Sequence, residues 1–181
     1  MDALLAVRPR AELRLVDIDP PRRLAPHSFA LGVELADDVA DALVAGGLPV
    51  DVTGRLVLLH DPTAHATWRG TFRIVSYLRA PLDPEQAEDP LLLEVSWSWL
   101  TDALEHCAAG YAALGGTVTR TSSARFGEIA GPTRGDDVEL RASWTPTDFE
   151  FGRHAEVFYL LLTHAIGLPE VGVSSMTDRH Y

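Results

Sequence analysis

The chain has 181 residues, with 26 acidic and 15 basic side chains and a net charge of −11, which disfavours binding to the phosphate backbone of nucleic acids. No apolar run approaches the roughly 20 residues that a membrane-spanning helix needs, and the first ten residues lack the pattern of a signal peptide. One cysteine, Cys107, excludes an internal disulfide and zinc sites of the paired-cysteine type, so we expect a single cytoplasmic domain over residues 1–181.

The first half of the chain predicts a short helix and four strands. Residues 1–7 are apolar, but such a short helix is unstable alone, so we expect residues 1–10 to be loosely ordered unless the helix docks. Residues 37–53 predict a short helix or a variable loop, because two glycines and a proline soon interrupt the helical spacing. Alternating or wholly apolar runs predict four strands: 12–18, 29–35, 55–60 and 71–79.

Two of these strands have informative patterns. The run 55–60 is apolar on both faces, which is typical of a strand that is covered on both sides or lies in the middle of a sheet. In the run 71–79, alternation separates an inward set (Phe72, Ile74 and Leu78) from an outward set (Arg73, Tyr77 and Arg79). The acidic, proline-containing segment that follows predicts a connection without secondary structure.

The second half predicts two longer helices with two strands between them. The first helix begins at Pro90, with Asp89 as its cap, carries apolar residues from Leu92 to Tyr111, and has Gly115-Gly116 as its stop. The strands are predicted at 117–121 and 138–144, and two pairs form the turn between them: Gly131-Pro132 and Gly135-Asp136.

The final helix is predicted by its start signal and its apolar stripe. Thr147 to Glu150 has the form of a capping box, and the stripe runs from Val157 to Ala165 before Gly167. Residues 170–181 have no pattern and are expected to be loosely ordered. The elements follow in the order (α)ββββαββα, which predicts an α+β fold: a mostly antiparallel sheet of about six strands, with two main helices packed on one face.

A run of hydroxyl and arginine side chains at 117–127 is a candidate anion site. If the strand is extended, however, Thr119 and Thr121 lie on the opposite face from Arg120, and β propensity alone also produces threonine-rich strands. Both interpretations stay open. The candidate ligand-binding residues are Arg120, Arg125, Arg141, Thr119, Thr121 and His60.

The common catalytic and metal-binding patterns are missing from the sequence. His60-Asp61-Pro62 near His65 is explained by chain turning, and His106 beside Cys107 on a helix does not make a nucleophile–base pair. No Gly-x-Ser-x-Gly elbow and no phosphate-binding glycine loop occurs. We therefore predict no catalytic residue, no metal and no cofactor, and leave open whether the protein is an enzyme.

Tryptophans are candidates for a protein contact. Trp144 follows the inward alternation of its strand and is predicted to lie in the core. Trp97 and Trp99 cannot both face the same core, because they lie two residues apart. Tryptophan beside arginine is common at interfaces, so Trp68, Arg69 and Trp97 form the predicted contact patch, with core cover as the alternative.

Five segments carry a resemblance to a known family: 22–26, 54–62, 97–100, 114–121 and 140–146. They read Arg-Arg-Leu-Ala-Pro, Gly-Arg-Leu-Val-Leu-Leu-His-Asp-Pro, Trp-Ser-Trp-Leu, Leu-Gly-Gly-Thr-Val-Thr-Arg-Thr and Leu-Arg-Ala-Ser-Trp-Thr-Pro. The chain resembles an uncharacterised actinobacterial family, a domain of unknown function, over residues 8–169. The resemblance implies a lineage and no reaction.

Two functions remain as hypotheses. The first is a noncatalytic protein-binding or adaptor domain, with a protein partner or a second copy of the chain, motivated by the lack of catalytic patterns. The second is a small-molecule or anion-binding protein, possibly enzymatic, with a site lined by arginine, threonine and serine. Convergence of Arg120, Arg125 and Arg141 on one cavity would favour the second hypothesis.

Overall fold

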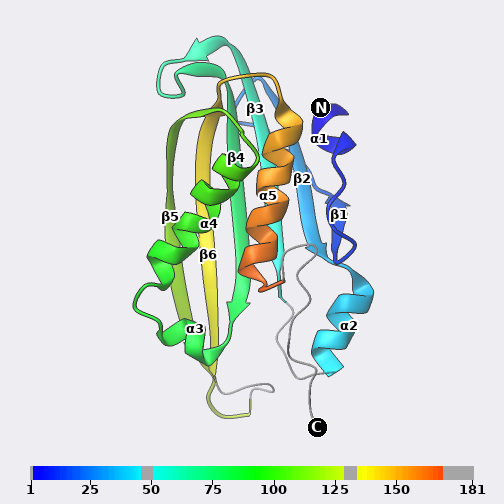
Figure 1. Cartoon of the computed structure of the whole chain (residues 1–181), viewed down its shortest axis with the longest axis vertical. Helices are drawn as coiled ribbons and strands as arrows, with labels where there is room; N and C mark the ends of the chain where they lie inside the picture. Colours follow the sequence, from blue (N-terminus) through cyan, green and yellow to red (C-terminus); the bar gives the residue numbers. More distant parts are fainter. Residues whose placement is uncertain (1, 46–50, 129–133, 169–181) are drawn as a thin grey trace.

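The computed structural model of the chain describes residues 2–45, 51–128 and 134–168 and has one six-stranded sheet with helices against one face (Figure 1). The elements are α1 (Asp2–Ala6), β1 (Leu13–Asp17), β2 (His27–Leu35), α2 (Asp37–Ala45), β3 (Thr53–His65), β4 (Gly70–Leu82), α3 (Pro84–Glu88), α4 (Leu92–His106), β5 (Tyr111–Ala124), β6 (Arg134–Pro146) and α5 (Phe151–Ala165). The strand order is β1-β2-β3-β4-β6-β5, and every neighbouring pair is antiparallel. The predicted α+β class and antiparallel sheet are confirmed.

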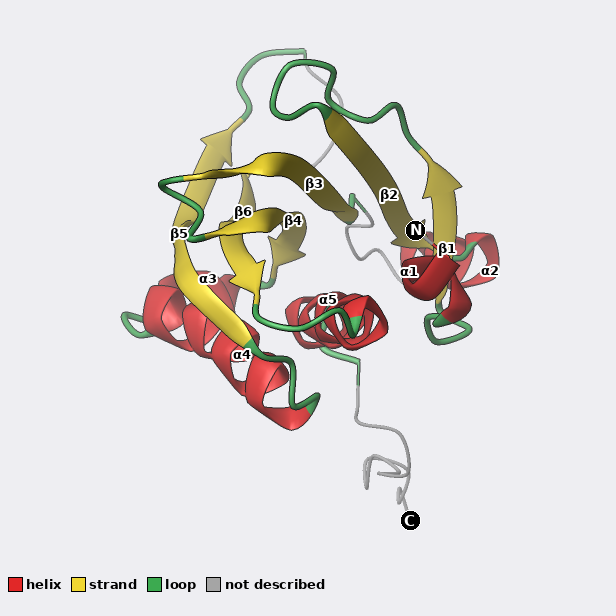
Figure 2. Cartoon of the chain, turned by 90° about the horizontal axis from the view of Figure 1, so that it is seen from above, coloured by secondary structure: helices red, strands yellow, loops and turns green. Residues whose placement is uncertain are grey.

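The core lies between the sheet and the helices α4 and α5. Seen from above, the strands bend around α5, with β1 and β5 at the two ends of the arc (Figure 2). Gly54 of β3 lets α5 approach closely, because a Cβ there would lie 2.9 Å from Leu162 and 3.0 Å from Phe158. On β5, Gly116 likewise lets α4 approach, because a Cβ there would lie 2.9 Å from Trp97. Helix packing therefore depends on glycines in the strands below.

The alternation predicted for β4 is confirmed. Ile74 and Leu78 are buried toward the helices, whereas Tyr77 and Arg79 lie on the other face. The apolar run in β3 lies third in the sheet, between β2 and β4. Because β3 has a neighbouring strand on each side, its backbone groups are paired within the sheet.

The long helix predicted from Pro90 to Tyr111 begins two residues too early and ends five residues too late. Helix α4 ends at His106, and the chain turns through Ala108, whose φ is 48°. Tyr111 instead begins β5, which has 14 residues and contains the predicted stop, Gly115-Gly116, just after a bulge between Ala112 and Gly115. The apolar residues near Tyr111 suit either element, and pairing with β6 decides for the strand.

Two helix starts also differ from the prediction. The acidic connection contains a helix, α3, which begins with a capping box between Asp83 and Gln86. The predicted capping box from Thr147 to Glu150 does not form, because the Asp148 side chain accepts a hydrogen bond from the Glu150 N–H and α5 begins at Phe151. Asp89 accepts a hydrogen bond from the Leu91 N–H, but the cap of α4 is Leu91, so the predicted cap at Asp89 is wrong by two residues. Local turns therefore shift the starts of α4 and α5 by a few residues from the positions that the sequence signals predict.

Several terminal and loop predictions have mixed outcomes. The first helix docks: Leu4 is 1% exposed and α1 packs on α5. Residues 37–45 form a helix, α2. Gly135-Asp136 lies in β6 rather than in a turn, whereas Gly131-Pro132 and residues 170–181 lie outside the described residues. No described helix is long and apolar enough to cross a membrane.

Candidate functional site

No described helix covers the face of β3, β4, β6 and β5 that points away from α4 and α5, here called the open face (Figure 2). Alternation along the strands gives this face a different composition from the core. On β5 it carries Thr117, Thr119, Thr121 and Ser123, as their register opposite β6 requires. The open face is therefore polar, with a few aliphatic side chains.

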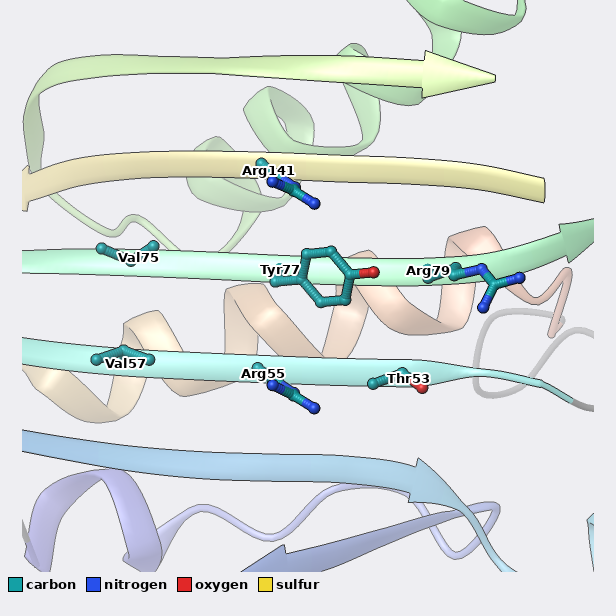
Figure 3. A pocket seen from close by; sticks show the side chains of 7 residues that line it. All are labelled: Thr53, Arg55, Val57, Val75, Tyr77, Arg79 and Arg141. Atoms are coloured by element: carbon teal, nitrogen blue, oxygen red, sulfur yellow. The ribbon is translucent and has the colours of Figure 1, made fainter. Parts of the chain in front are cut away.

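A cavity of about 480 Å3 lies at the centre of the open face. All its walls are side chains that stand on β3, β4 and β6 (Figure 3). They are Thr53, Arg55, Val57, Val75, Tyr77, Arg79 and Arg141. Three arginines therefore meet on one surface of an acidic protein, which makes this cavity the leading candidate site.

The centre of the cavity is a row of three side chains in register across the sheet. Arg55 pairs with Tyr77, and Tyr77 pairs with Arg141 (Figure 3). The Arg141 guanidinium carbon lies 5.4 Å from the centroid of the Tyr77 ring, within cation–π distance. The Tyr77 hydroxyl donates to Glu139 at 3.0 Å, and burial, reinforced by this carboxylate, raises the pKa of Tyr77. The Tyr77 side chain is therefore held in place by Arg141 and by Glu139.

Two of the three cavity arginines are already paired with carboxylates. Arg79 bridges Asp51 at 3.0 Å and Asp137 at 2.9 Å, and the hydrogen bond to Asp137 raises its pKa. Arg141 contacts Glu139 at 2.7 Å and is 64% exposed. These pairs hold the side chains in place but neutralise much of their charge.

Arg55 differs from the other two arginines. It is exposed, and it makes no hydrogen bond or ion pair with any of the residues that the structure describes. Its charge is therefore available to an external acidic group. Arg55, Tyr77 and the solvent side of Arg141 make a cationic row that a carboxylate or phosphate can approach from solution.

A fourth arginine on this face has a structural role. Arg73 donates to the Ser143 hydroxyl at 2.7 Å, the Thr145 hydroxyl at 3.3 Å and the Ala113 carbonyl at 2.9 Å. Burial lowers the pKa of Arg73. Arg73 stands on β4 and donates to residues of β6 and β5. This side chain therefore links the three strands.

The residues predicted to bind a ligand are not brought together. Thr119, Thr121 and Arg141 lie on the open face, whereas Arg120 points to the helix side and donates to the Ala87 carbonyl. Arg125 follows the end of β5 and is exposed. His60 also lies away from the cavity, where its ring stacks on His27 and on Phe72 at 5.6 and 4.3 Å between centroids. The three arginines of the prediction therefore do not share one cavity.

Sequence reasoning missed Arg55 and did not connect it with Tyr77. Alternation alone places Tyr77 and Arg79 outward, and the same rule applied to 55–60 places Arg55 on one face of its strand. The missing information is the register between β3, β4 and β6. Sequence carries little signal for register in the absence of turn types that set it.

The predicted tryptophan patch is divided between two places. Trp97 lies in α4 against Gly116 and is half-buried. Trp68 lies in the β3–β4 connection, where its carbonyl accepts a hydrogen bond from the Thr145 hydroxyl, and Arg69 is exposed with a φ of 59°. A protein contact through these residues stays a prediction.

The titratable groups outside the cavity are spread over the molecule. Burial raises the pKa of Cys107, which is half-buried. His154 is fully buried; its Nδ1 accepts from the Trp144 indole at 3.1 Å, which places Trp144 in the core as predicted. Burial lowers the pKa of His154 to about 4. Among the described residues no group of three potential metal ligands comes together.

Comparison with known proteins gives one family. The model of a family described as "Protein of unknown function (DUF3000)" matches residues 1–174. No curated protein and no solved structure matches the chain. The predicted resemblance to a domain of unknown function is therefore confirmed over nearly the whole sequence.

Proposed function

The chain belongs to the DUF3000 family, whose function is unknown, and we propose that it is a binding or adaptor protein that recognises an acidic segment of a partner protein through its open face. The observation that carries this proposal is the row Arg55–Tyr77–Arg141 at the centre of an uncovered sheet. Within that row, Arg55 is an exposed cation without a partner among the described residues. A carboxylate from outside would complete its hydrogen bonding.

The shape of the cavity favours a protein partner over a small molecule. Its lining comes from side chains on three adjacent strands (Figure 3), and the described helices lie on the other face of the sheet (Figure 2). Small-molecule sites usually enclose most of the ligand's surface. A ligand on the open face is contacted from one side, which suits a segment that belongs to a larger surface.

The composition of the cavity also fits a protein interface. Tyrosine and arginine are enriched at such interfaces, and here the Tyr77 ring stands between two guanidinium groups. Val57 and Val75 are paired across β3 and β4, and they are the next residues on the same face after Arg55 and Tyr77. They offer apolar contact beside the charges. Since the whole chain carries a charge of −11, attraction of an acidic segment is local, and binding should weaken as salt screens it.

An NMR titration with a glutamate-rich peptide tests this proposal. We expect amide shifts at Arg55, Val75 and Tyr77, and an affinity about tenfold lower in Arg55→Glu, because the charge that contacts the peptide is reversed. The matched control is Arg8→Glu, which changes an exposed arginine in the connection between α1 and β1. Its affinity should equal that of the wild type.

Two results would overturn the proposal. One is a titration without shifts on the open face. The other is an unchanged affinity in Arg55→Glu. Inorganic phosphate is titrated in parallel: if phosphate shifts the same residues and the peptide does not, the site binds small anions instead.

A further inference from the structure

The two edges of the sheet differ in how well they are protected against pairing with another strand. β1 has five residues and contains Arg14 and Asp17. Short, charged edge strands pair poorly with strands of other chains. β5 has 14 residues and pairs only with β6. From Gly116 to Ala124, no other backbone pairing of β5 is recorded among the described residues. This strand therefore presents a long row of free backbone groups.

The β5 edge is also poor in charge. Its one charged side chain is Arg120, which is held on the helix side by the Ala87 carbonyl. None of the 26 acidic residues lies within Tyr111–Ala124. Two copies of a chain with a charge of −11 repel each other least where carboxylates are missing from the contact.

The side chains of β5 suit a copy of themselves. In an antiparallel pair related by a two-fold axis, the open faces of both copies lie on the same side of the enlarged sheet. The residues that then face each other across the new junction are hydroxyls, Thr117, Thr119, Thr121 and Ser123. Threonine pairs across strands are stabilising, and several registers bring hydroxyl to hydroxyl.

A hollow next to this edge is open in the single chain and has a mixed lining, with Asp89 and Arg120 beside apolar side chains. It measures about 420 Å3 and lies between the start of α4 and β5, where Leu93 and Val118 line it. Leu93 is 44% exposed. Since α4 packs on β5, a second copy paired along β5 brings its own α4 to this side and covers Leu93.

We propose that β5 is the contact edge of a homodimer, in which two β5 strands pair antiparallel and join the two sheets into one. The occupant is a second copy because β5 contains no carboxylate and would place its hydroxyl side chains opposite those of another β5. The open faces stay uncovered in this dimer, so the inference does not depend on the function proposed above.

Analytical ultracentrifugation over a dilution series tests the dimer. We expect the wild type to have twice the mass of the chain and Thr119→Lys to have the mass of one chain. Lysine there lies opposite Glu139 within the same sheet, so the fold is retained, while a charge enters the middle of the contact edge. Ala11→Lys is the control, since Ala11 is exposed in the turn before β1, and it should remain a dimer.

A wild type that sediments as one chain overturns the inference, and so does a Thr119→Lys variant that remains dimeric. Hydrogen exchange on the wild type keeps the test decisive if the lysine variant does not fold. Amides of Thr117–Thr121 should exchange faster on dilution, when the dimer separates. Exchange in this segment that is independent of concentration contradicts the proposal.

Discussion

The two faces of the sheet are built from the same strands but have opposite properties. Toward the helices, Leu78 and Leu140 are fully buried. Their neighbours in the same strands, Tyr77 and Arg141, lie on the open face, and Arg141 is 64% exposed. The comparison teaches that alternate residues of one strand serve different purposes: one set packs the core, and the other set includes side chains that are exposed to solvent.

The energies of the two faces explain this division. Burying a large apolar side chain contributes about 1.5–3 kcal/mol. An exposed ion pair such as Arg141 with Glu139 contributes about 0–1 kcal/mol, because water and salt screen it. Substitutions on the helix side should therefore cost much more stability than those on the open face.

The largest effect is expected for Phe158→Ala on the helix side. Phe158 is fully buried against Gly54, and truncation leaves a cavity, so the free energy of unfolding should fall by about 4 kcal/mol. Urea denaturation followed by circular dichroism measures this loss. Phe149→Ala is the control: Phe149 is 76% exposed, and its loss should cost below about 1 kcal/mol. Equal losses in the two variants would contradict the division.

The helix side should also make stability depend on pH through His154. Its folded pKa is about 4, against 6.5 for an ordinary histidine, so the unfolded chain takes up the proton first. The stability is fully present above pH 6.5 and falls as the pH drops from 6.5 to 4, by about 3 kcal/mol in total. Burial is the main cause; Asp148 opposes it, and Arg153 reinforces it.

Urea denaturation at a series of pH values measures this dependence. His154→Asn keeps an acceptor for the Trp144 indole and removes the titrating group. The variant should lose the part of the pH dependence that belongs to His154, whereas the contribution of the carboxylates remains. A variant whose pH profile between 6.5 and 4 matches that of the wild type would show that His154 does not titrate in this way.

Two adjacent glycines in β5 lie on opposite faces of the sheet, Gly116 on the helix side and Gly115 on the open face, so substitutions there compare the two faces. A Cβ at Gly116 would lie 2.2 Å from the Arg141 carbonyl oxygen and 2.9 Å from Trp97, whereas a Cβ at Gly115 meets nothing within 4 Å. Gly116→Ala should therefore cost about 2 kcal/mol, and Gly115→Ala should be close to neutral. Thermal unfolding measures both, and the reverse order would mean that α4 does not pack on this strand as described.

The smallest effect on stability is expected for Arg55→Ala. Its exposed side chain makes no ion pair or hydrogen bond with the described residues, so the free energy of unfolding should change by less than about 0.5 kcal/mol. The same denaturation assay checks this value. A larger loss would indicate that Arg55 supports the fold, and would remove the contrast between the faces.

Much of the fold could be predicted because burial leaves a local pattern. The inward and outward sets of β4 follow from alternation, and the buried stripe of α5 follows from helical spacing. The end of α4 could not be predicted in this way. Its apolar residues and those of early β5 form one run that suits a helix, and only the turn at Ala108 and pairing with β6 separate them.

The candidate site was less accessible to prediction than the fold. The hydroxyl and arginine run drew attention to Arg120, and alternation already implied that its neighbours Thr119 and Thr121 point the other way. The row of Arg55, Tyr77 and Arg141 is scattered over more than 80 positions of the sequence. No local pattern links these residues.

The sequence by itself determined which side chains of each strand share a face, because side chains alternate along any extended chain. It also determined the acidic character of the molecule and the apolar stripe of α5. Only the tertiary structure decided that β6 lies between β4 and β5, and that Arg55, Tyr77 and Arg141 stand in one row. Strand order and register arise from hydrogen bonds between distant segments, and these bonds depend on the backbone, which is the same for every residue except proline.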